Sequence, residues 1–250
     1  MLAIAFEGCA CRAAFHAGVA AALAERALPF ALTAGASSGS LIAVGLAAGR
    51  GAELPAIWRA LAGRSIVSLR RVLHNRSPFD MSHLVRTTLE ATLGGPTADL
   101  RAHRVEALVT ATRLRDLGRV VFSTREEPDM LPPLLGSCFF PLLYGRTVRV
   151  RGQLYVDGGL VDNLPLEALV ARGARELIAV TTRSDGTALK TPWRRRWRPR
   201  VDASLDAGSG ARVHVIHPRA PLANRSWDFS PDAIARAIDD GYDAARRFFG

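Results

Sequence analysis

The alternation of short apolar runs with helix-forming segments over the first 50 residues is the feature that most constrains the fold. The runs 2–6 and 30–34 are short and apolar, as buried strands are, and the segments 13–27 and 40–49 are rich in helix-forming residues. The order is therefore strand, loop, helix, strand, turn, helix, which is typical of α/β proteins. It predicts a mainly parallel central sheet in a three-layer α/β/α arrangement, with helices on both faces.

The remaining chain continues this pattern. Further strands are expected at 104–114, 118–124, 176–182 and 211–218. The alternation of apolar and polar residues over 147–156 predicts a hairpin, and helices are expected over 164–173 and 230–250. No internal repeat is found, so we expect a single domain, 1–250, with a basic surface insertion at about 183–210.

Composition and charge describe a globular chain with one unusual segment. Of the 250 residues 48% are hydrophobic and 22% are charged, and the formal net charge is +10. Segment 183–200 alone contributes +6, so the charge is local and does not make the whole domain a nucleic-acid binder. Within it, Trp193 to Arg200 mixes tryptophan with arginine. Three interpretations stay open: a solvated loop, contact with an anionic membrane surface and, as the weakest, contact with nucleic acid.

The cysteines and the N-terminus bear on location. Cys9, Cys11 and Cys138 are odd in number, and the first two are too close for an ordinary disulfide framework, which favours a reducing compartment. The N-terminal residues do not resemble a signal peptide, and no apolar run is long enough to span a membrane. We therefore expect a cytoplasmic protein, with peripheral membrane association as the alternative. No matching Cys/His cluster suggests a metal site, and no cofactor is expected.

The pentapeptide Gly35-Ala36-Ser37-Ser38-Gly39 is the first candidate site. It fits G-x-S-x-G and lies between a predicted strand and a predicted helix. A serine at such a turn is exposed above the sheet, and the N–H groups of the next helix favour developing negative charge beside it. The motif alone is short enough to occur by chance, and its alternative interpretation is a tight glycine-rich turn. The strand–turn–helix context favours Ser37 as a nucleophile, with Gly35 and Gly39 giving the turn its room.

Two further segments follow predicted strands. The first is a loop of small residues whose backbone N–H groups can face an anion: Gly8, Cys9, Ala10, Cys11, Arg12 and Ala13. The second is "YVDGGLVDNLPL", in which Asp157 ends a strand and precedes Gly158 and Gly159. Taken singly, the first is compatible with an ordinary strand–helix turn, and the second with a turn-forming aspartate.

Together the three segments resemble the patatin-like phospholipase family. The order of the glycine-rich loop, G-x-S-x-G and D-G-G is that of the family, and "GSCFFPLLY" (136–144) is similar to the segment that precedes its aspartate motif. "GCACRAAFHAGV" and "GASSGS" look particularly like the adipose triglyceride lipase branch. The resemblance covers about residues 2–182.

The resemblance implies a patatin-like fold and a serine–aspartate dyad without histidine. Ser37 is then the nucleophile and Asp157 its base, and backbone N–H groups of the Gly8–Ala13 loop form the oxyanion hole, with Arg12 matching the family's arginine. The expected activity is cleavage of carboxylic esters in lipids through an acyl-enzyme, with a lipid or ester as the partner and neither metal nor cofactor. A histidine triad, completed by His214 or His217, is the less favoured arrangement.

The chain departs from the family pattern in the oxyanion loop. Cys9, Ala10 and Ala13 stand where the family has glycine, and each added Cβ restricts the backbone and its approach to a ligand. Ser40 also replaces a frequent glycine. Two alternatives to hydrolysis therefore stay open: a weakly active lipid-binding or regulatory protein on the same fold, and an acyltransferase that uses the same dyad. The lipid class and the oligomeric state are left undetermined by the sequence.

Overall fold

The computed structural model describes residues 1–63, 86–88, 90–91, 100–139, 148–188 and 210–250, and these contain one sheet of eight strands. The strands are β1 (Leu2–Phe6), β2 (Leu32–Ala36), β3 (Glu106–Arg113), β4 (Gly118–Ser123), β5 (Val148–Val150), β6 (Gln153–Asp157), β7 (Glu176–Val180) and β8 (Arg212–Ile216). Their order is β5-β6-β3-β2-β1-β7-β8, and β4 also pairs with β3. The pairs from β8 to β3 are parallel, and the pairs of β3 with β4, β3 with β6 and β5 with β6 are antiparallel.

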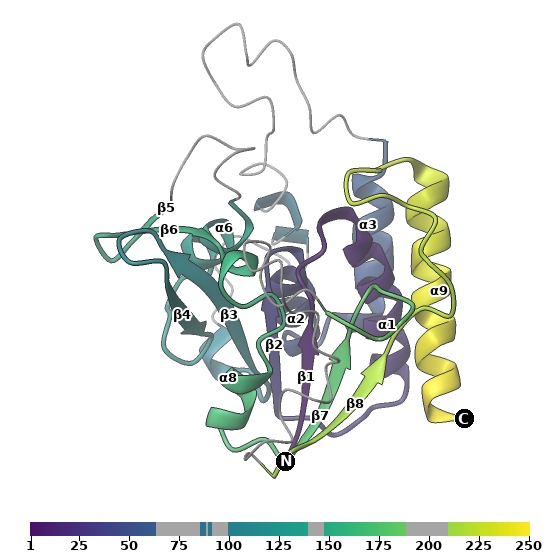
Figure 1. The fold of residues 1–250 in the computed structure, drawn as a ribbon, viewed down its shortest axis with the longest axis horizontal. Helices are drawn as coiled ribbons and strands as arrows, with labels where there is room; N and C mark the ends of the chain where they lie inside the picture. Colours follow the sequence, from purple (N-terminus) through teal and green to yellow (C-terminus); the bar gives the residue numbers. More distant parts are fainter. Residues whose placement is uncertain (64–85, 89, 92–99, 140–147, 189–209) are drawn as a thin grey trace, which may run out of the picture.

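Helices cover both faces of this sheet (Figure 1). They are α1 (Ala13–Glu25), α2 (Ser38–Ala47), α3 (Leu54–Leu61), α6 (Leu131–Cys138), α8 (Leu166–Ala171) and α9 (Pro231–Phe249), with four short 3-10 helices, η1 (Ala10–Arg12), η2 (Gly51–Glu53), η3 (Leu100–Ala102) and η4 (Gly158–Leu160). Helices α1, α2 and α6 pack on one face of the sheet, and α9 packs over α1. Helix α8 packs on the opposite face.

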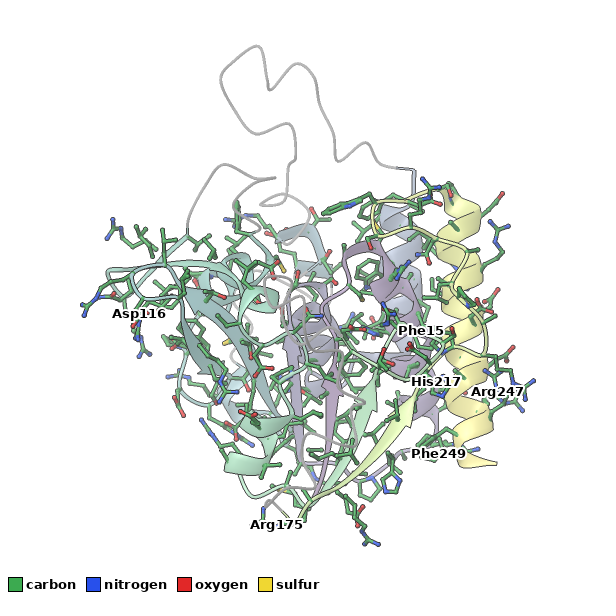
Figure 2. All side chains as sticks on the ribbon, in the orientation of Figure 1. Phe15, Asp116, Arg175, His217, Arg247 and Phe249 are labelled. Carbon is green, nitrogen blue, oxygen red and sulfur yellow. The ribbon has the colours of Figure 1, made fainter. Side chains whose placement is uncertain are left out.

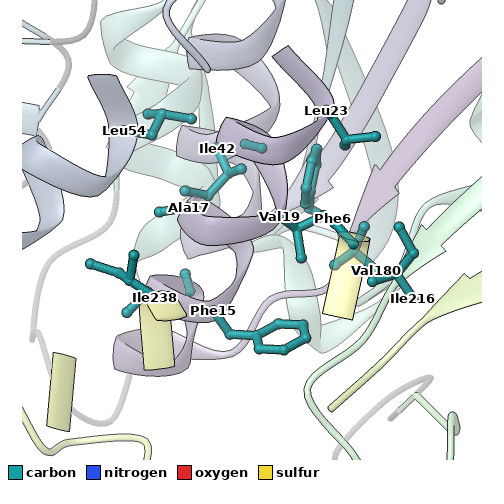
Figure 3. Packing of buried hydrophobic residues seen from close by; sticks show 14 of the residues in the cluster. Phe6, Phe15, Ala17, Val19, Leu23, Ile42, Leu54, Val180, Ile216 and Ile238 are labelled. Carbon is teal, nitrogen blue, oxygen red and sulfur yellow. The ribbon is translucent and has the colours of Figure 1, made fainter. Parts of the chain in front are cut away.

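Alternate residues of each buried strand enter different cores. Ile4 and Phe6 of β1 pack among the residues of α1, α2 and α9, as the close view in Figure 3 shows for Phe6. Ala3 and Ala5 pack on the other face with Leu166 and Leu169 of α8. Since both faces of β1 are covered, its sequence is apolar throughout and does not alternate.

The predicted fold class is confirmed, since the central sheet is mixed and mostly parallel. The hairpin at 147–156 is present as β5 and β6, and the strands expected at 104–114 and 118–124 pair as β3 and β4. The helix expected over 164–173 is shorter, because Pro165 precedes its first turn and Gly173 has φ of 89°. The helix α6, with Pro132 and Pro133 in its first turn, was not predicted.

Two predictions about the chain's organisation lie partly outside the described residues. The basic insertion at about 183–210 is described only to residue 188 and again from residue 210. Trp193 to Arg200 therefore lie outside the described residues, and their role in membrane contact stays a prediction. Among the helices that the structure describes, none combines the length and the apolar character needed to cross a membrane.

The sheet brings the three motifs to one edge. The carboxyl ends of the parallel strands β1 and β2 are neighbours, with Phe6 opposite Gly35, so the loops that follow them lie side by side. In the register of β3, Ala36 pairs with Thr110 and Asp157 pairs with Ala111. The antiparallel strand β6 therefore ends at the level at which β2 ends, although 120 residues separate Ser37 from Asp157.

Candidate active site

Ser37 occupies the sharp turn between β2 and α2. Its φ is 51° and its ψ is −133°, a backbone conformation that side-chain-bearing residues rarely adopt and that costs roughly 1–3 kcal/mol. The turn is tight, because a Cβ at Gly39 would lie 2.5 Å from the carbonyl oxygen of Phe6. This geometry leaves Ser37 partly exposed at the N-terminus of α2, while Ala36 and Ser38 are buried.

The Ser37 hydroxyl donates a hydrogen bond to Asp157. The distance from Ser37 Oγ to Asp157 Oδ2 is 2.8 Å. The other carboxylate oxygen, Oδ1, accepts from the N–H of Gly159 at 2.8 Å. Both oxygens of the carboxylate are therefore held, and Oδ2 is the one directed at the serine.

The backbone of Asp157 is anchored by two neighbouring segments. Its N–H donates to the carbonyl oxygen of Phe139, at the end of α6, and its own carbonyl oxygen accepts from the Thr112 hydroxyl of β3, both at 2.7 Å. These hydrogen bonds fix the backbone of Asp157 relative to the sheet. The position of its carboxylate beside Ser37 therefore depends on the backbone as well as on the side-chain rotamer.

Burial sets the basicity of Asp157. Its side chain is 6% exposed, and the loss of hydration raises its pKa to about 6, although the hydrogen bonds from Ser37 and Gly159 act in the opposite direction. Within the described residues, no Lys, Arg or His forms an ion pair with it. A carboxylate with this pKa is a stronger base than an ordinary aspartate and is still mostly ionised at neutral pH.

Ser137 fixes the backbone of the nucleophile turn. The N–H of Ser37 donates to Ser137 Oγ at 2.9 Å, and this hydroxyl donates to the carbonyl oxygen of Thr110 at 2.6 Å. Ser137 is fully buried in α6, 100 residues from Ser37 in the chain. Its contact satisfies the N–H of a residue whose backbone conformation is unfavourable.

The Gly8–Ala13 loop begins at the carboxyl end of β1 and reaches the same turn. A Cβ at Gly8 would lie 3.1 Å from Ser37 Cβ, so the two loops are in direct contact. Most N–H groups of the loop already have acceptors, which are Asn163 O for Gly8, Ser38 Oγ for Cys9, Ser226 O for Cys11, Cys9 O for Arg12 and Ala10 O for Ala13. For the N–H of Ala10, no acceptor is found among the described residues.

The three replaced glycines of this loop differ in their backbone conformation. Cys9 has φ of −152° with ψ of 16°, and Ala13 has φ of −64°, so neither residue adopts the positive φ that favours glycine. Ala10 has φ of 53°, in the left-handed region that favours glycine. The positions of Cys9 and Ala13 therefore do not require the left-handed conformation, which occurs in this loop at Ala10.

Arg12 anchors the loop to the segment between β8 and α9. Its Nε donates to the carbonyl oxygen of Asn224 at 3.3 Å, next to the hydrogen bond from the N–H of Cys11 to Ser226. Both acceptors belong to the segment between β8 and α9. The side chain of Arg12 thus fixes the position of the loop, while the loop's backbone faces Ser37.

The histidines proposed for a triad lie elsewhere. His214 on β8 contacts Glu176, with 3.2 Å between Nε2 and the carboxylate, and His217 contacts the carbonyl oxygen of Pro218. Figure 2 shows His217 on the side of the sheet near α9, and β8 is three strands from β2. The Ser37 hydroxyl meets Asp157 directly, so the geometry favours a dyad over the histidine triad.

His16 contacts the Gly8–Ala13 loop, and it is fully buried. Its Nδ1 lies 3.7 Å from Cys9 Sγ, and burial lowers its pKa to about 3. It is therefore neutral at physiological pH and serves the packing of α1. Among the described residues, no group of His, Cys, Asp and Glu side chains is arranged to hold a metal ion.

Comparisons with known proteins agree with the fold and identify the family. The family model described as patatin-like phospholipase matches residues 4–170. Patatin-like phospholipase domain-containing protein 2 of Rattus norvegicus is 32% identical over 179 residues, which are 66% of this chain and 35% of that protein. The 1-acylglycerol-3-phosphate O-acyltransferase Pnpla3 of Mus musculus is 30% identical over 174 residues, 65% of this chain and 40% of that protein.

A solved structure gives the same fold. Human GIVD cytosolic phospholipase A2, in complex with methyl γ-linolenyl fluorophosphonate, superposes with a TM-score of 0.56 at 12% identity, covering 98% of this chain and 57% of the other. The α/β fold, with its mixed and mostly parallel central sheet, is therefore that of patatin-domain phospholipases. The chain belongs to the patatin-like phospholipase family, a family of lipid acyl hydrolases, and it spans about a third of the length of the rat relative.

The structure adds three polar residues to the surroundings of the dyad that the sequence did not single out. They are Ser137, Glu7 and Asn163. Ser137 and Asn163 belong to motifs that carry the family resemblance, which is the one signal that draws attention to them. Glu7 is a buried carboxylate beside the oxyanion loop, and the sequence alone offers no signal for its role.

Proposed function

We propose that this protein is a serine acyl hydrolase that cleaves carboxylic esters in lipids. One observation carries the proposal: the hydrogen bond of 2.8 Å from Ser37 Oγ to the buried carboxylate of Asp157. A serine hydroxyl is a poor nucleophile until a positioned base accepts its proton, and a desolvated aspartate is such a base. Membership in a family of lipid acyl hydrolases supports the substrate class.

The reaction follows from the contacts of the two residues. Asp157 accepts the Ser37 proton as Oγ forms a bond to the ester carbonyl carbon, and the carbonyl π electrons move to oxygen. The oxyanion collapses, the bond to the leaving alcohol breaks, and Asp157 returns the proton to that alcohol. Water then attacks the acyl-enzyme by the same route, again with Asp157 as base, and releases the carboxylic acid and free Ser37.

The oxyanion requires hydrogen-bond donors beside Ser37. The N–H of Ala10 and the N-terminal amides of α2 lie on the two loops that meet there. Such donors are worth roughly 3–4 kcal/mol each in a serine hydrolase, so the altered loop bears directly on rate. If the strain at Ala10 moves its N–H away from the oxyanion, we expect a weakly active protein whose role is lipid binding or regulation.

The experiment is labelling of the intact protein with a fluorophosphonate probe, read by mass spectrometry, beside Ser37→Ala and Asp157→Asn. We expect one label on wild-type protein at Ser37, none on Ser37→Ala and much slower labelling of Asp157→Asn. A folded wild-type protein that does not react would overturn the enzyme proposal and favour the lipid-binding alternative.

Acyl transfer is a second candidate, favoured by the relative named as an acyltransferase. The same acyl-enzyme serves both reactions, because an acceptor alcohol can replace water in its second half. Product analysis with an ester substrate, with and without an added acceptor alcohol, separates them. A new ester that accumulates at the expense of free acid identifies transfer, whereas free acid alone identifies hydrolysis.

A further inference from the structure

We infer that Asn163 is a positioning residue, which holds the oxyanion loop at Gly8 against the loop that carries Asp157. The inference rests on the proposed function, because the oxyanion loop has a catalytic meaning only in an acyl hydrolase. Asn163 follows Asp157 by six residues, is 8% exposed, and does not contact Ser37 through any hydrogen bond of the described residues.

Asn163 and Gly8 are joined by two reciprocal hydrogen bonds. The N–H of Gly8 donates to the carbonyl oxygen of Asn163 at 3.0 Å, and Nδ2 of Asn163 donates to the carbonyl oxygen of Gly8 at 2.9 Å. The orientation of the amide follows from its surroundings, because Nδ2 faces two acceptors, Gly8 O and a carboxylate oxygen of Glu7 at 3.5 Å. Both the N–H and the carbonyl oxygen of Gly8 are thus held by Asn163.

The amide oxygen of Asn163 lies between the two loops. A Cβ at Gly8 or at Gly159 would in each case lie 2.5 Å from Asn163 Oδ1. Gly159 is the residue whose N–H binds Asp157 Oδ1. One side chain therefore fills the space between the loop that carries the base and the loop that carries the oxyanion donors, and any shift of Asn163 changes their separation.

Glu7 ties this contact to the sheet. Its Oε2 accepts from the N–H of Thr182 at 3.0 Å and from the Thr182 hydroxyl at 3.2 Å, just beyond the end of β7. Glu7 is 3% exposed and Thr182 is buried, so these hydrogen bonds are shielded from water. Buried polar groups in such a network stabilise one arrangement strongly, because an unpaired member is costly.

The network also affects the strength of a donor. The carbonyl of Gly8 and the N–H of Cys9 belong to the same peptide unit, so a hydrogen bond to that carbonyl polarises the unit and strengthens the hydrogen bond that the Cys9 N–H donates to Ser38 Oγ. Loss of the Asn163 amide therefore has two consequences at once. The loop loses its fixed distance from Ser37, and its hydrogen bond to Ser38, at the start of α2, is weaker.

The test compares Asn163→Ala and Asn163→Asp with Asp162→Asn. Both Asn163 variants remove the donor to Gly8, and the aspartate variant keeps the side-chain volume. The Asp162 variant breaks the ion pair of the buried Asp162 with Arg119, at 2.8 Å, one residue away from Asn163. We expect kcat on a lipid ester to fall by about 10- to 100-fold in both Asn163 variants, with KM within about threefold, because displaced catalytic groups slow the chemical step.

The acid limb of the pH–rate profile distinguishes positioning from a change in the base. We expect its midpoint to stay unchanged in Asn163→Ala, because the hydrogen bonds of Asp157 to Ser37 and Gly159 are retained. A shifted midpoint, an unchanged kcat in both folded Asn163 variants, or an equal loss of kcat in Asp162→Asn would each overturn the inference.

Hydrogen exchange of the peptide that contains residues 7–16 separates this inference from the proposed function. We expect faster exchange of this peptide in Asn163→Ala and unchanged exchange in Asp162→Asn, whether or not the protein hydrolyses esters. If wild-type protein resists the fluorophosphonate probe while the loop still loosens, the proposed function fails and the structural role of Asn163 stands. If the loop does not loosen, the positioning role fails.

Discussion

The turn after β2 and the loop after β1 are neighbours at the same sheet edge, yet they are held in different ways. The β2 turn keeps both glycines of its motif, because the space beside Gly39 is closed by the backbone of Phe6 and Glu7. The β1 loop has larger residues at positions where the family resemblance predicts glycine, and it is held by hydrogen bonds to Asn163, Ser38 and Ser226. The packing at Gly39 leaves no room for an added atom, whereas position 10 accepts alanine in a strained backbone conformation.

This difference separates two reasons for a glycine. At Gly39 the requirement is steric, since the absence of a side chain leaves room for the backbone of Phe6 and Glu7 at the end of β1. At position 10 the requirement is conformational, and alanine meets it at an energetic cost because the left-handed region is unfavourable but accessible. Four predictions test this distinction and the site around it, from the largest expected effect to the smallest.

The largest effect is expected for Gly39→Ala. The new Cβ would lie 2.5 Å from the carbonyl oxygen of Phe6 and 2.6 Å from that of Glu7, and neither backbone group can move without shifting β1. We expect a loss of about 3 kcal/mol or more in the free energy of unfolding, measured by urea denaturation. The exposed Gly152, with open space around its Cα but φ of 79°, is the control, and Gly152→Ala should cost about 1–2 kcal/mol. Equal losses in both would contradict the steric interpretation.

The second prediction concerns the charge buried beside the β2 turn. The folded-state pKa of Asp157, about 6, lies above its unfolded value, so the folded protein binds the extra proton and loses stability as the pH rises from about 4 to about 6. Asp157→Asn removes this penalty. We expect the variant to be more stable than wild-type protein by about 2–3 kcal/mol at pH 7.5, with little difference at about pH 4.

The same titration governs activity with the opposite sign. Asp157 acts as a base only when ionised, so kcat of wild-type protein should rise with pH through a midpoint of about 6. Asp116→Asn is the control for stability, because the hydrogen bonds from Arg113 lower the pKa of Asp116 to about 2 and its removal gives no gain at neutral pH. A stability difference for Asp157→Asn that does not depend on pH would contradict the assignment.

The sequence predicted the parts of this molecule that depend on local chemistry. The alternation of strands and helices, the hairpin at 147–156 and the positions of the three motifs follow from short segments and the family resemblance. The contacts of Ser137 and Asn163 could not be predicted, because they join residues 100 or more positions apart and depend on how distant strands pair in the sheet. The strain at Ala10 could not be predicted from the sequence either, since alanine adopts positive φ only when its surroundings impose it.

The third prediction isolates the strain at the nucleophile. Ser37→Ala and Ser37→Gly both remove the hydroxyl, but only glycine adopts φ of 51° with ψ of −133° readily. We expect Ser37→Gly to be more stable than Ser37→Ala by about 1–2 kcal/mol in thermal or urea unfolding, with both variants inactive. If the alanine variant is the more stable, the turn at Ser37 is not strained.

The smallest effect is expected for Ala10→Gly. Glycine relieves the positive φ of 53°, but its greater freedom in the unfolded chain offsets part of the gain, which leaves about 0.5–1 kcal/mol. The matched control is Ala27→Gly, because Ala27 has φ of 47° in an exposed turn before β2 and away from the dyad. Both variants should gain similar stability. Only Ala10→Gly should raise kcat, by up to about tenfold, because it alone lets the N–H of residue 10 move toward the oxyanion. A rise in both variants would assign the gain to stability, and a rise in neither would show that the strained loop already places its donor well.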